Sequence, residues 1–404
     1  MSRIGSAWRV AILAVFFFSV LNSTLYAQEE GITREFSGNV SLENRFFLND
    51  GIYQGQHRNY LSMSFTPEYL VEWKEGKKSI KFIGFARVDQ YDSKRTHFDI
   101  RELYYQVVKT DWELSIGLKK IFWGVTESAH LVDIINQTDV VESFDGEQKL
   151  GQPMVHFSYL STVGTFDLFA MPYFRKRQFP GREGRLRPAF LIDKGDFTFE
   201  SSAEEYRPDF AIRWSHFVGA FDIGLSHFYG TGREQFFSPN ADGSIDIFYG
   251  IINQTGLDVQ ATTGPILWKL EGILRESDFQ DMKALATGIE YTFGNVWNSG
   301  IDIGLVGEYL YDDRDNLAFS SLQDDLFFAT RLAFNDTQDT QILLGGIFDR
   351  ERSSELISLE GSRRFGSSWK GVIEARLLND IDTKEFIYFV REDSFLQFSL
   401  AKYF

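Results

Sequence analysis

Cysteine is absent from the sequence, and long apolar runs and prolines are scarce. The absence of cysteine excludes a disulfide framework, thiolate metal sites and thiol catalysis. Beyond the N-terminus no segment approaches about eighteen uninterrupted apolar residues, which excludes a bundle of membrane-spanning helices. Several of the eight prolines, such as Pro153, Pro180, Pro208 and Pro265, lie at expected strand starts or in loops, where a missing N–H does least harm.

Basic residues and enzyme motifs are also in short supply. The chain has 41 Lys and Arg against 57 Asp and Glu, a formal net charge of −16, which argues against a nucleic-acid partner. It contains no G-x-S-x-G elbow and no H-E-x-x-H pair, and its six histidines lack ligand spacing. His156 and Ser158 share one expected strand face, but the sequence shows no orienting acid beside them. We therefore predict no enzyme, no metal and no cofactor.

The N-terminus has the parts of a secretory signal. Arg3 and Arg9 are basic, residues 10–21 are apolar, and Leu25-Tyr26-Ala27 forms a cleavage site. The apolar run is too short for a spanning helix. We expect residues 1–27 to be removed and residues 28–404 to form one domain.

The end of the chain, residues 386–404, alternates like a strand. Leu396, Phe398 and Leu400 are apolar, and the residues between them are polar. An alternating strand that ends on an aromatic residue, here Phe404, is typical of bacterial outer-membrane barrels, whose assembly machinery we expect to recognise it. The 40 Phe, 17 Tyr and 8 Trp exceed the needs of one soluble core but suit two aromatic girdles.

The same alternation recurs along the chain and predicts an all-β fold, a transmembrane antiparallel barrel of about 18 strands, with sixteen as the alternative. The expected strands are 34–48, 58–73, 79–92, 97–109, 111–121, 153–161, 164–174, 207–217, 219–230, 245–261, 265–274, 283–293, 300–311, 324–334, 340–350, 354–364, 368–379 and 386–404. Connections after even-numbered strands are short, whereas several of the others, notably 122–152 and 175–206, are long. This asymmetry predicts short periplasmic turns and long extracellular loops.

A barrel of this size leaves an aqueous channel unless something fills it. The loop 122–152 carries apolar residues that we expect to pack against the inner wall, with a short amphipathic helical turn at 130–136. We predict a constriction or plug here, a loop folded over the rim being the alternative; its candidate residues are Trp123, Glu127, His130, Asp133, Asn136 and Asp139. Glu127, His130 and Asp133 would share one face of a helix, either as a small metal or substrate site or as plain polar decoration.

A second loop concentrates positive charge in an acidic protein, at Arg175, Lys176, Arg177, Arg182, Arg185 and Arg187. Guanidinium groups pair well with phosphates and carboxylates. Three interpretations stay open: contact with outer-membrane lipid and lipopolysaccharide, attraction of an anionic solute, and balance against Glu200, Glu204 and Glu205 of the same loop.

Strand parity also predicts a lumen of mixed charge. The inward side chains include Glu43, Arg45, Glu68, Arg87, Asp89, Arg213, Glu271, Glu290, Glu308, Arg331, Glu374 and Arg376. Acidic and basic rows that face each other across a wet constriction would orient polar solutes.

Two blocks of sequence are similar to a proteobacterial family of uncharacterised, porin-like outer-membrane proteins. Residues 117–124 (GLKKIFWG) and 133–139 (DIINQTD) resemble the family's G-R-Q…W-G and D-x-I-N-P-x-D blocks, with Lys119-Lys120 in place of Arg-Gln and Gln137 in place of Pro. Residues 179–182 (FPGR) and Arg213 near 221–225 look like its next two blocks. The resemblance spans roughly residues 100–230. It implies a large barrel that passes solutes or lipid-like molecules, and occasional partnership with inner-membrane transporters.

Three functions follow as hypotheses. The first is an outer-membrane channel for small or medium hydrophilic solutes. The second is a conduit for an apolar or lipid-like substrate that works with an inner-membrane transporter. The third is a structural or adhesive barrel with a closed lumen.

Overall fold

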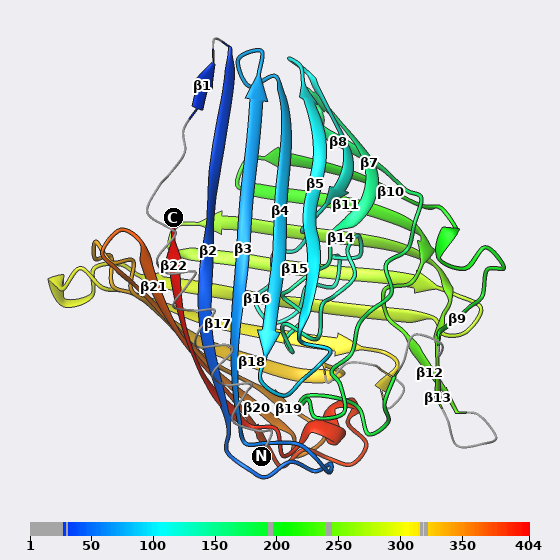
Figure 1. The fold of residues 1–404 in the computed structure, drawn as a ribbon, viewed down its shortest axis with the longest axis vertical. Helices are drawn as coiled ribbons and strands as arrows, with labels where there is room; N and C mark the ends of the chain where they lie inside the picture. Colours follow the sequence, from blue (N-terminus) through cyan, green and yellow to red (C-terminus); the bar gives the residue numbers. More distant parts are fainter. Residues whose placement is uncertain (1–26, 30, 193–196, 240–244, 316–317, 319–321) are drawn as a thin grey trace, which may run out of the picture.

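The computed structural model describes residues 27–29, 31–192, 197–239, 245–315, 318 and 322–404. The predicted signal peptide lies, apart from its last residue, outside these described residues. Figure 1 shows a barrel with its strands inclined to one another and its connections gathered at two ends.

Eighteen strands of the described chain form the barrel wall. They are β2 (Ile32–Phe47), β3 (Asn59–Trp73), β4 (Lys78–Asp89), β5 (His97–Val108), β6 (Trp112–Lys119), β7 (Gln152–Ser161), β8 (Gly164–Met171), β10 (Asp209–Val218), β11 (Phe221–Thr231), β14 (Ile251–Thr263), β15 (Ile266–Glu276), β16 (Met282–Phe293), β17 (Asp302–Asp312), β18 (Asp324–Ala333), β19 (Gln341–Asp349), β20 (Glu355–Phe365), β21 (Trp369–Asn379) and β22 (Phe395–Tyr403). Each pairs antiparallel with the next, and β22 pairs with β2, which closes the wall.

Alternation places the two kinds of side chain on opposite faces of this wall. On β2 the apolar Leu42 and Phe46 are exposed on the outside, whereas Glu43 and Arg45 between them are buried inside. Phe398 of β22 continues the apolar outer face. An apolar outside and a polar inside suit a barrel surrounded by lipid, so the predicted fold and strand number are confirmed.

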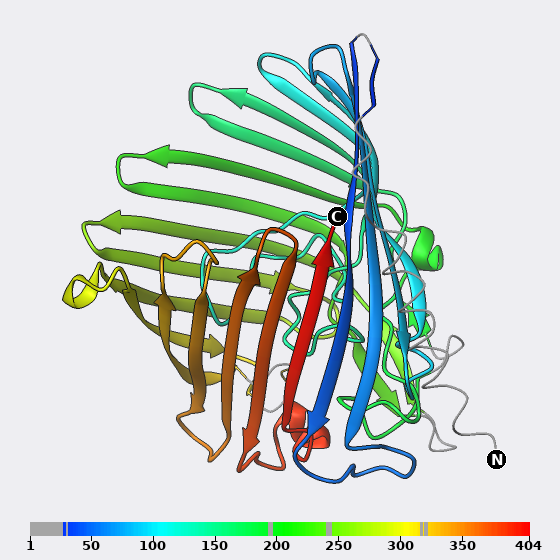
Figure 2. The same ribbon diagram turned by 60° about the vertical axis from the view of Figure 1, so that its left-hand side comes forward.

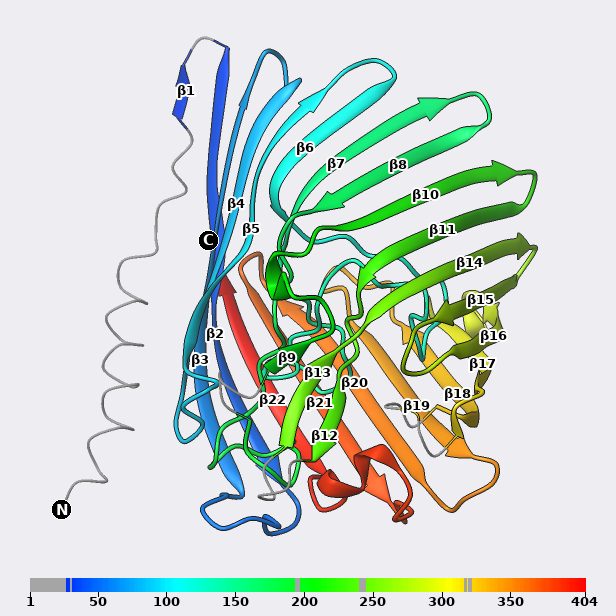
Figure 3. The same cartoon turned by 90° about the vertical axis from the view of Figure 1, so that its right-hand side faces the viewer.

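The connections at the two ends of the barrel differ in length, as predicted. The turns after β7 and β10 contain two residues each, 162–163 and 219–220, while the long-loop end carries residues 120–151 and 172–208. We call these the inner loop and the upper loop. A small separate sheet of β9 (Phe197–Phe199), β12 (Phe236–Pro239) and β13 (Ile245–Tyr249) lies outside the long-loop end of the wall (Figure 3).

Two strand predictions were wrong in part. Residues 386–390 form a 3-10 helix, η4 (Phe386–Val390), and the last strand starts only at Phe395. Buried Ile387 and Val390 are three residues apart, a spacing that suits a helical turn and not a strand. The segment 245–249 pairs in the small sheet, so that the barrel strand there starts at Ile251.

Minor elements complete the described chain. The three-residue β1 (Ala27–Glu29) pairs with the start of β2. Two short 3-10 helices are η1 (Glu204–Tyr206) and η2 (Val296–Asn298). None of the helices among the described residues is long and apolar enough to cross a membrane.

Candidate functional site: the loop inside the barrel

The inner loop enters the barrel and crosses its interior (Figure 2). Its first anchor is Glu271, a fully buried carboxylate on β15. The Oε1 of Glu271 accepts hydrogen bonds from the backbone N–H groups of Val125 and Thr126, at 2.6 and 3.0 Å, and from the Thr126 hydroxyl at 2.8 Å. Its Oε2 accepts the N–H of Val132 at 3.2 Å. One wall carboxylate therefore satisfies donors from two segments of the loop.

A second wall carboxylate repeats this arrangement two strands away. Glu308 of β17 accepts the backbone N–H groups of Glu127 and Ser128 at 2.7 and 2.9 Å, and the Ser128 hydroxyl at 2.5 Å. The Glu127 carboxylate in turn contacts Arg331 of β18 at 2.7 Å and Lys269 of β15 at 3.6 Å. Charge-assisted bonds of this kind hold irregular backbone inside a barrel, where it has no strand partner.

Further contacts join the inner loop to other parts of the wall. Asp139 pairs with Arg101 of β5 at 2.6 Å. Asp145 pairs with Arg376 of β21 at 2.8 Å. Because β5, β15 to β18 and β21 lie on different sides of the barrel, the loop spans the lumen from wall to wall.

Several apolar residues of the inner loop face the wall. Trp123, Val132 and Ile135 are buried in a cluster with inward side chains of β7 to β16, such as Phe169 and Ile273. Trp123 packs edge-on against Phe169, with ring centroids 5.6 Å apart. Phe122 is the exception, because its side chain is 58% exposed and packs edge-on against His130.

Gly124 lets the inner loop approach the wall closely. Its φ is +148°, and a Cβ there would lie 2.8 Å from the His130 Nδ1 and 3.1 Å from the Glu271 Oε1. Only glycine fits this backbone without displacing one of those groups.

The predicted helical turn at 130–136 is not formed, because residues 120–151 contain no helix. Glu127, His130 and Asp133 consequently share no face. The His130 Nε2 lies 3.2 Å from Glu147, and Asp133 pairs with Lys149 at 3.2 Å. These side chains serve different contacts, and no common ligand site joins them.

The surroundings of two titratable side chains in the inner loop, His130 and Asp133, shift their pKa values. Burial alone would lower the pKa of His130, but the carboxylates of Glu147 and Glu271 outweigh it and raise that pKa to about 10. Burial raises the pKa of Asp133, against the opposing effect of Lys149. His130 is therefore a cation at neutral pH.

Asn136 closes the base of the inner loop. Its Oδ1 accepts the N–H of Ile121 at 2.9 Å, and its Nδ2 donates to the carbonyls of Lys119 and Leu150 at 3.0 and 2.8 Å. This buried amide ties together the two ends of the loop. The asparagine in the family-like block thus has a positioning role.

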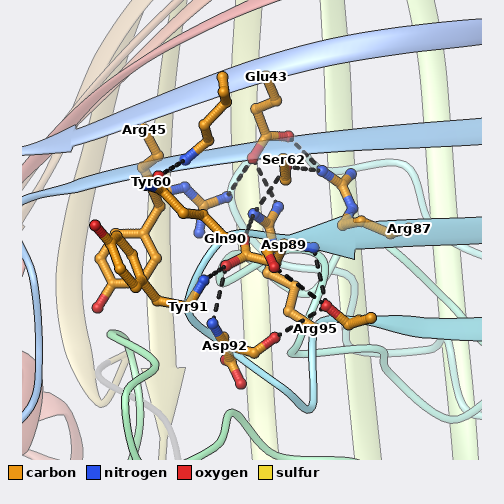
Figure 4. Close-up of polar contacts among 12 residues, drawn as sticks. Glu43, Arg45, Tyr60, Ser62, Arg87, Asp89, Gln90, Tyr91, Asp92 and Arg95 are labelled. Carbon is orange, nitrogen blue, oxygen red and sulfur yellow. Dashed lines mark hydrogen bonds and ion pairs between the residues drawn. The ribbon is translucent and has the colours of Figure 1, made fainter. Parts of the chain in front are cut away.

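A dense ion-pair network fills the lumen beside β2 to β5 (Figure 4). Arg95 pairs with Glu43 at 2.7 Å and with Asp89 at 3.2 Å, while Arg87 contacts the other oxygen of Glu43 at 3.1 Å. The Arg45 Nε donates to Gln397 of β22 at 2.7 Å. These side chains exclude water, since that of Glu43 is only 9% exposed.

Other lumenal charges remain wet. The Glu360 side chain of β20 is 50% exposed, and those of Arg331 and Asp145 are 35% and 32% exposed. Arg331 and Glu360 belong to the wall formed by β18 to β21, and Asp145 belongs to the inner loop that faces it. Lys81 of β4 and Glu113 of β6, on the other side of the lumen, are exposed to a similar degree, 34% and 33%. Water therefore reaches charged side chains on both sides of the lumen, and Glu360 is the most exposed of these five.

The remaining predicted lumenal residues also lie along the inner wall. Arg213 of β10 makes a two-pronged pair with Asp258 of β14, at 2.6 and 2.8 Å. Glu68 of β3 stands opposite Ile83 of β4. Neither residue contacts the inner loop through a hydrogen bond.

Most basic residues of the upper loop form ion pairs or hydrogen bonds within the protein. Arg175 pairs with Asp99, and Lys176 with Glu205. Arg177 donates to Gln137 of the inner loop, Arg187 donates to the Pro188 carbonyl, and Arg182 is exposed. Internal pairing favours the charge-balance interpretation, although of the three glutamates proposed as partners only Glu205 pairs with the cluster.

Arg185 makes the most deeply buried of these ion pairs, with its side chain and that of its partner only 1% and 4% exposed. It is buried and binds Asp393, next to β22, at 2.7 Å, and Asp393 also accepts the N–H of Leu186 at 2.7 Å. Leu186 has a φ of +57°, a conformation that costs energy for a branched residue and persists only where the surroundings hold it. The upper loop is thereby fastened across the long-loop end.

His156, on the inner face of β7, has an acid partner that the sequence did not reveal. Its Nε2 lies 2.9 Å from Asp167 of β8, and its Nδ1 lies 3.3 Å from the Lys119 ammonium. Both ring nitrogens are engaged, which leaves none to take a proton from a serine hydroxyl.

Wall and loop together define the class of protein. A closed antiparallel barrel with an apolar outer face, a charged inner face and a loop folded inward is an outer-membrane β-barrel, a fold that belongs to the bacterial outer membrane. No protein-family model matches the sequence, and a search among curated proteins finds no match.

Solved structures confirm the fold. The chain is similar to a BenF-like porin from Pseudomonas fluorescens Pf-5, with a TM-score of 0.54, 10% identity, and coverage of 93% of this chain and 98% of that one. It is similar to Wzi of Escherichia coli, an outer-membrane protein involved in group 1 capsule assembly and a carbohydrate-binding barrel (0.52, 13% identity, 99% and 88%). It is also similar to OccK11 (OpdR) of Pseudomonas aeruginosa (0.51, 10% identity, 94% and 99%).

Proposed function

We propose that this protein is a porin-like channel for small hydrophilic solutes, with the inner loop as its constriction. The observation that carries the proposal is that charged side chains of the lumen stay partly exposed although the inner loop is bonded to the wall. The inner loop is bonded tightly to Glu271 and Glu308, while half-exposed charges such as Glu360 line the space on its other side. A water-filled gap lined by charged side chains suits polar solutes.

This geometry supports the hydrophilic channel over a conduit for a lipid-like substrate. That alternative depended on apolar residues of the inner loop lining the passage. Val132 and Ile135 instead pack against the wall and are fully buried, and Phe122 is the one large apolar side chain of the described inner loop that is more than half exposed. The wet side of the loop offers an apolar molecule charged side chains, whose desolvation costs free energy.

The absence of cysteine makes a direct test simple. The purified barrel is reconstituted in a planar bilayer, and Glu360→Cys is treated with a bulky methanethiosulfonate reagent. We expect stepwise conductance that the reagent reduces. The matched control is Glu75→Cys in the turn after β3, where the side chain is 89% exposed and labelling should leave the current unchanged. Folded protein without conductance steps would refute the channel.

A further inference from the structure

The inner wall next to the passage is organised in one row of cross-strand partners. Arg331 of β18 stands opposite Leu343 of β19, Leu343 opposite Glu360 of β20, and Glu360 opposite Glu374 of β21. Glu374 then stands opposite Gln397 of β22. Since directly paired residues lie on the same face of a sheet, this row forms a continuous strip along the passage.

The inner loop meets both ends of this strip. Glu127 pairs with Arg331 at one end, and Asp145 pairs with Arg376, two residues beyond Glu374, at the other. At the Arg376 end the wall also presents the half-exposed Glu360. A solute that moves along this strip meets Glu360 and its neighbours.

Charge is balanced at the Arg331 end. Glu127 and Glu290 face Arg331 and Lys269, with each acid within 3.9 Å of both cations. These two carboxylates and two cations leave no net charge among themselves. The nearby Glu308 carboxylate is bonded to N–H and O–H donors of the inner loop and is only 2% exposed, so a solute does not contact it. This end therefore contributes less to selection by sign of charge than the Arg376 end.

Charge is not balanced at the Arg376 end. The Arg376 Nη2 lies 2.8 Å from Asp145, 2.6 Å from Glu360 and 3.5 Å from Glu374. One guanidinium thus faces three carboxylates, which we call the Arg376 cluster, and the formal charges of the cluster sum to −2. Arg45, the next cation along the wall, is bound to Glu43 and Gln397 and interacts with Glu374 only electrostatically, so it offsets this excess in part.

We infer that the passage favours cations over anions, and that its solutes are small cations or zwitterions whose ammonium groups meet the Arg376 cluster. This inference rests on the proposed channel. An excess of carboxylates at a narrow point lowers the free energy of a cation there and raises that of an anion. Leu343, beside Glu360 in the strip, adds an apolar contact for the body of an organic solute.

The test is the reversal potential of the reconstituted channel in a KCl gradient. We expect a permeability ratio of K⁺ to Cl⁻ above one. Glu360→Gln should lower this ratio by about twofold, and Arg376→Gln should raise it, because the two changes shift the same cluster in opposite directions. Glu75→Gln, with the same loss of charge in an exposed turn, is the matched control and should leave the ratio unchanged.

The outcomes separate the two proposals. A protein without conductance refutes the channel itself. A conducting protein with a ratio at or below one, or with a ratio that Glu360→Gln and Arg376→Gln do not move, refutes cation preference and leaves the channel standing. Circular dichroism of each variant confirms that its barrel is folded, and Glu360→Gln disrupts the structure less than Arg376→Gln because Glu360 is half exposed and Arg376 is only 14% exposed.

Discussion

Removal of the Glu271 side chain should release the inner loop from the wall while the barrel stays closed. Glu271 is fully buried and accepts four hydrogen bonds from the loop, three of them from backbone N–H groups. In Glu271→Ala those three donors lose their acceptor inside the protein. The strand ladders of β15 do not pass through this carboxylate, so the wall keeps its own hydrogen bonds.

The expected loss of free energy follows from the number of buried N–H donors that are left without an acceptor. An unsatisfied buried donor costs about 1–3 kcal/mol, and breaking a buried charged contact costs about 3–5 kcal/mol. We expect the free energy of local opening of the loop to fall by about 3–5 kcal/mol. Glu271→Gln keeps one carbonyl oxygen for the Val125 and Thr126 donors and loses the bond to Val132, which costs about 1–3 kcal/mol.

Hydrogen exchange of the backbone amides measures this opening directly. A fall of 3 kcal/mol corresponds to roughly 100-fold faster exchange at Val125, Thr126 and Val132, with Glu271→Gln between wild type and Glu271→Ala. Single-channel recordings should show larger and noisier currents in the same order. Unchanged protection of these amides in Glu271→Ala would refute the anchoring role, and Glu290→Ala, another inward acid that accepts no loop N–H in the described structure, is the control.

Three further predictions concern other contacts. The raised pKa of His130, about 10, means that its ion pair with Glu147 stabilises the inner loop fully below the unfolded pKa of about 6.5 and is lost as the pH rises through 10. Current noise should therefore grow between pH 7 and 10 in wild type and stay flat in His130→Gln; parallel profiles would contradict this. Asp393→Ala leaves the Arg185 guanidinium buried without its carboxylate, at a cost of about 3–5 kcal/mol, so the upper loop should become sensitive to added protease, and equal cleavage rates would exclude the fastening role. Deleting Phe404 should reduce the amount of barrel inserted in the membrane, measured against total expressed protein, whereas an unaltered inserted fraction would show that the terminal ring is dispensable.

The wall could be predicted because its signals are local. Alternation along β2, where Leu42 and Phe46 flank Glu43 and Arg45, is visible within a few residues and requires no knowledge of distant partners. Strand number, the two unequal ends and the charged lumen follow from the same pattern. The prediction failed at 386–394, where a run of apolar residues without alternation forms η4 and a turn.

The site could be predicted only as a location. A long loop with apolar residues indicated an inward fold at 122–152, and the structure places residues 120–151 there. The carboxylates that hold this loop lie far along the chain, Glu271 and Glu308 being separated from Thr126 and Ser128 by 145 and 180 residues. The same applies to Arg185, whose partner Asp393 lies 208 residues away. Without knowledge of that partner, the sequence cannot distinguish a buried structural arginine from a charged residue on the surface.

The sequence by itself therefore determined the type of fold, because every second residue of a strand faces the same side and the apolar and polar residues alternate accordingly. The tertiary structure decided which part of the lumen is dry, which part is wet, and how many carboxylates meet one arginine at the passage. The physical reason is that burial and charge balance depend on distances across a closed wall. The inward fold of the inner loop brings Asp145 to Arg376, 231 residues further along the chain, and the pairing of β20 with β21 places Glu360 and Glu374 beside the same guanidinium. No local pattern encodes the contact of Asp145.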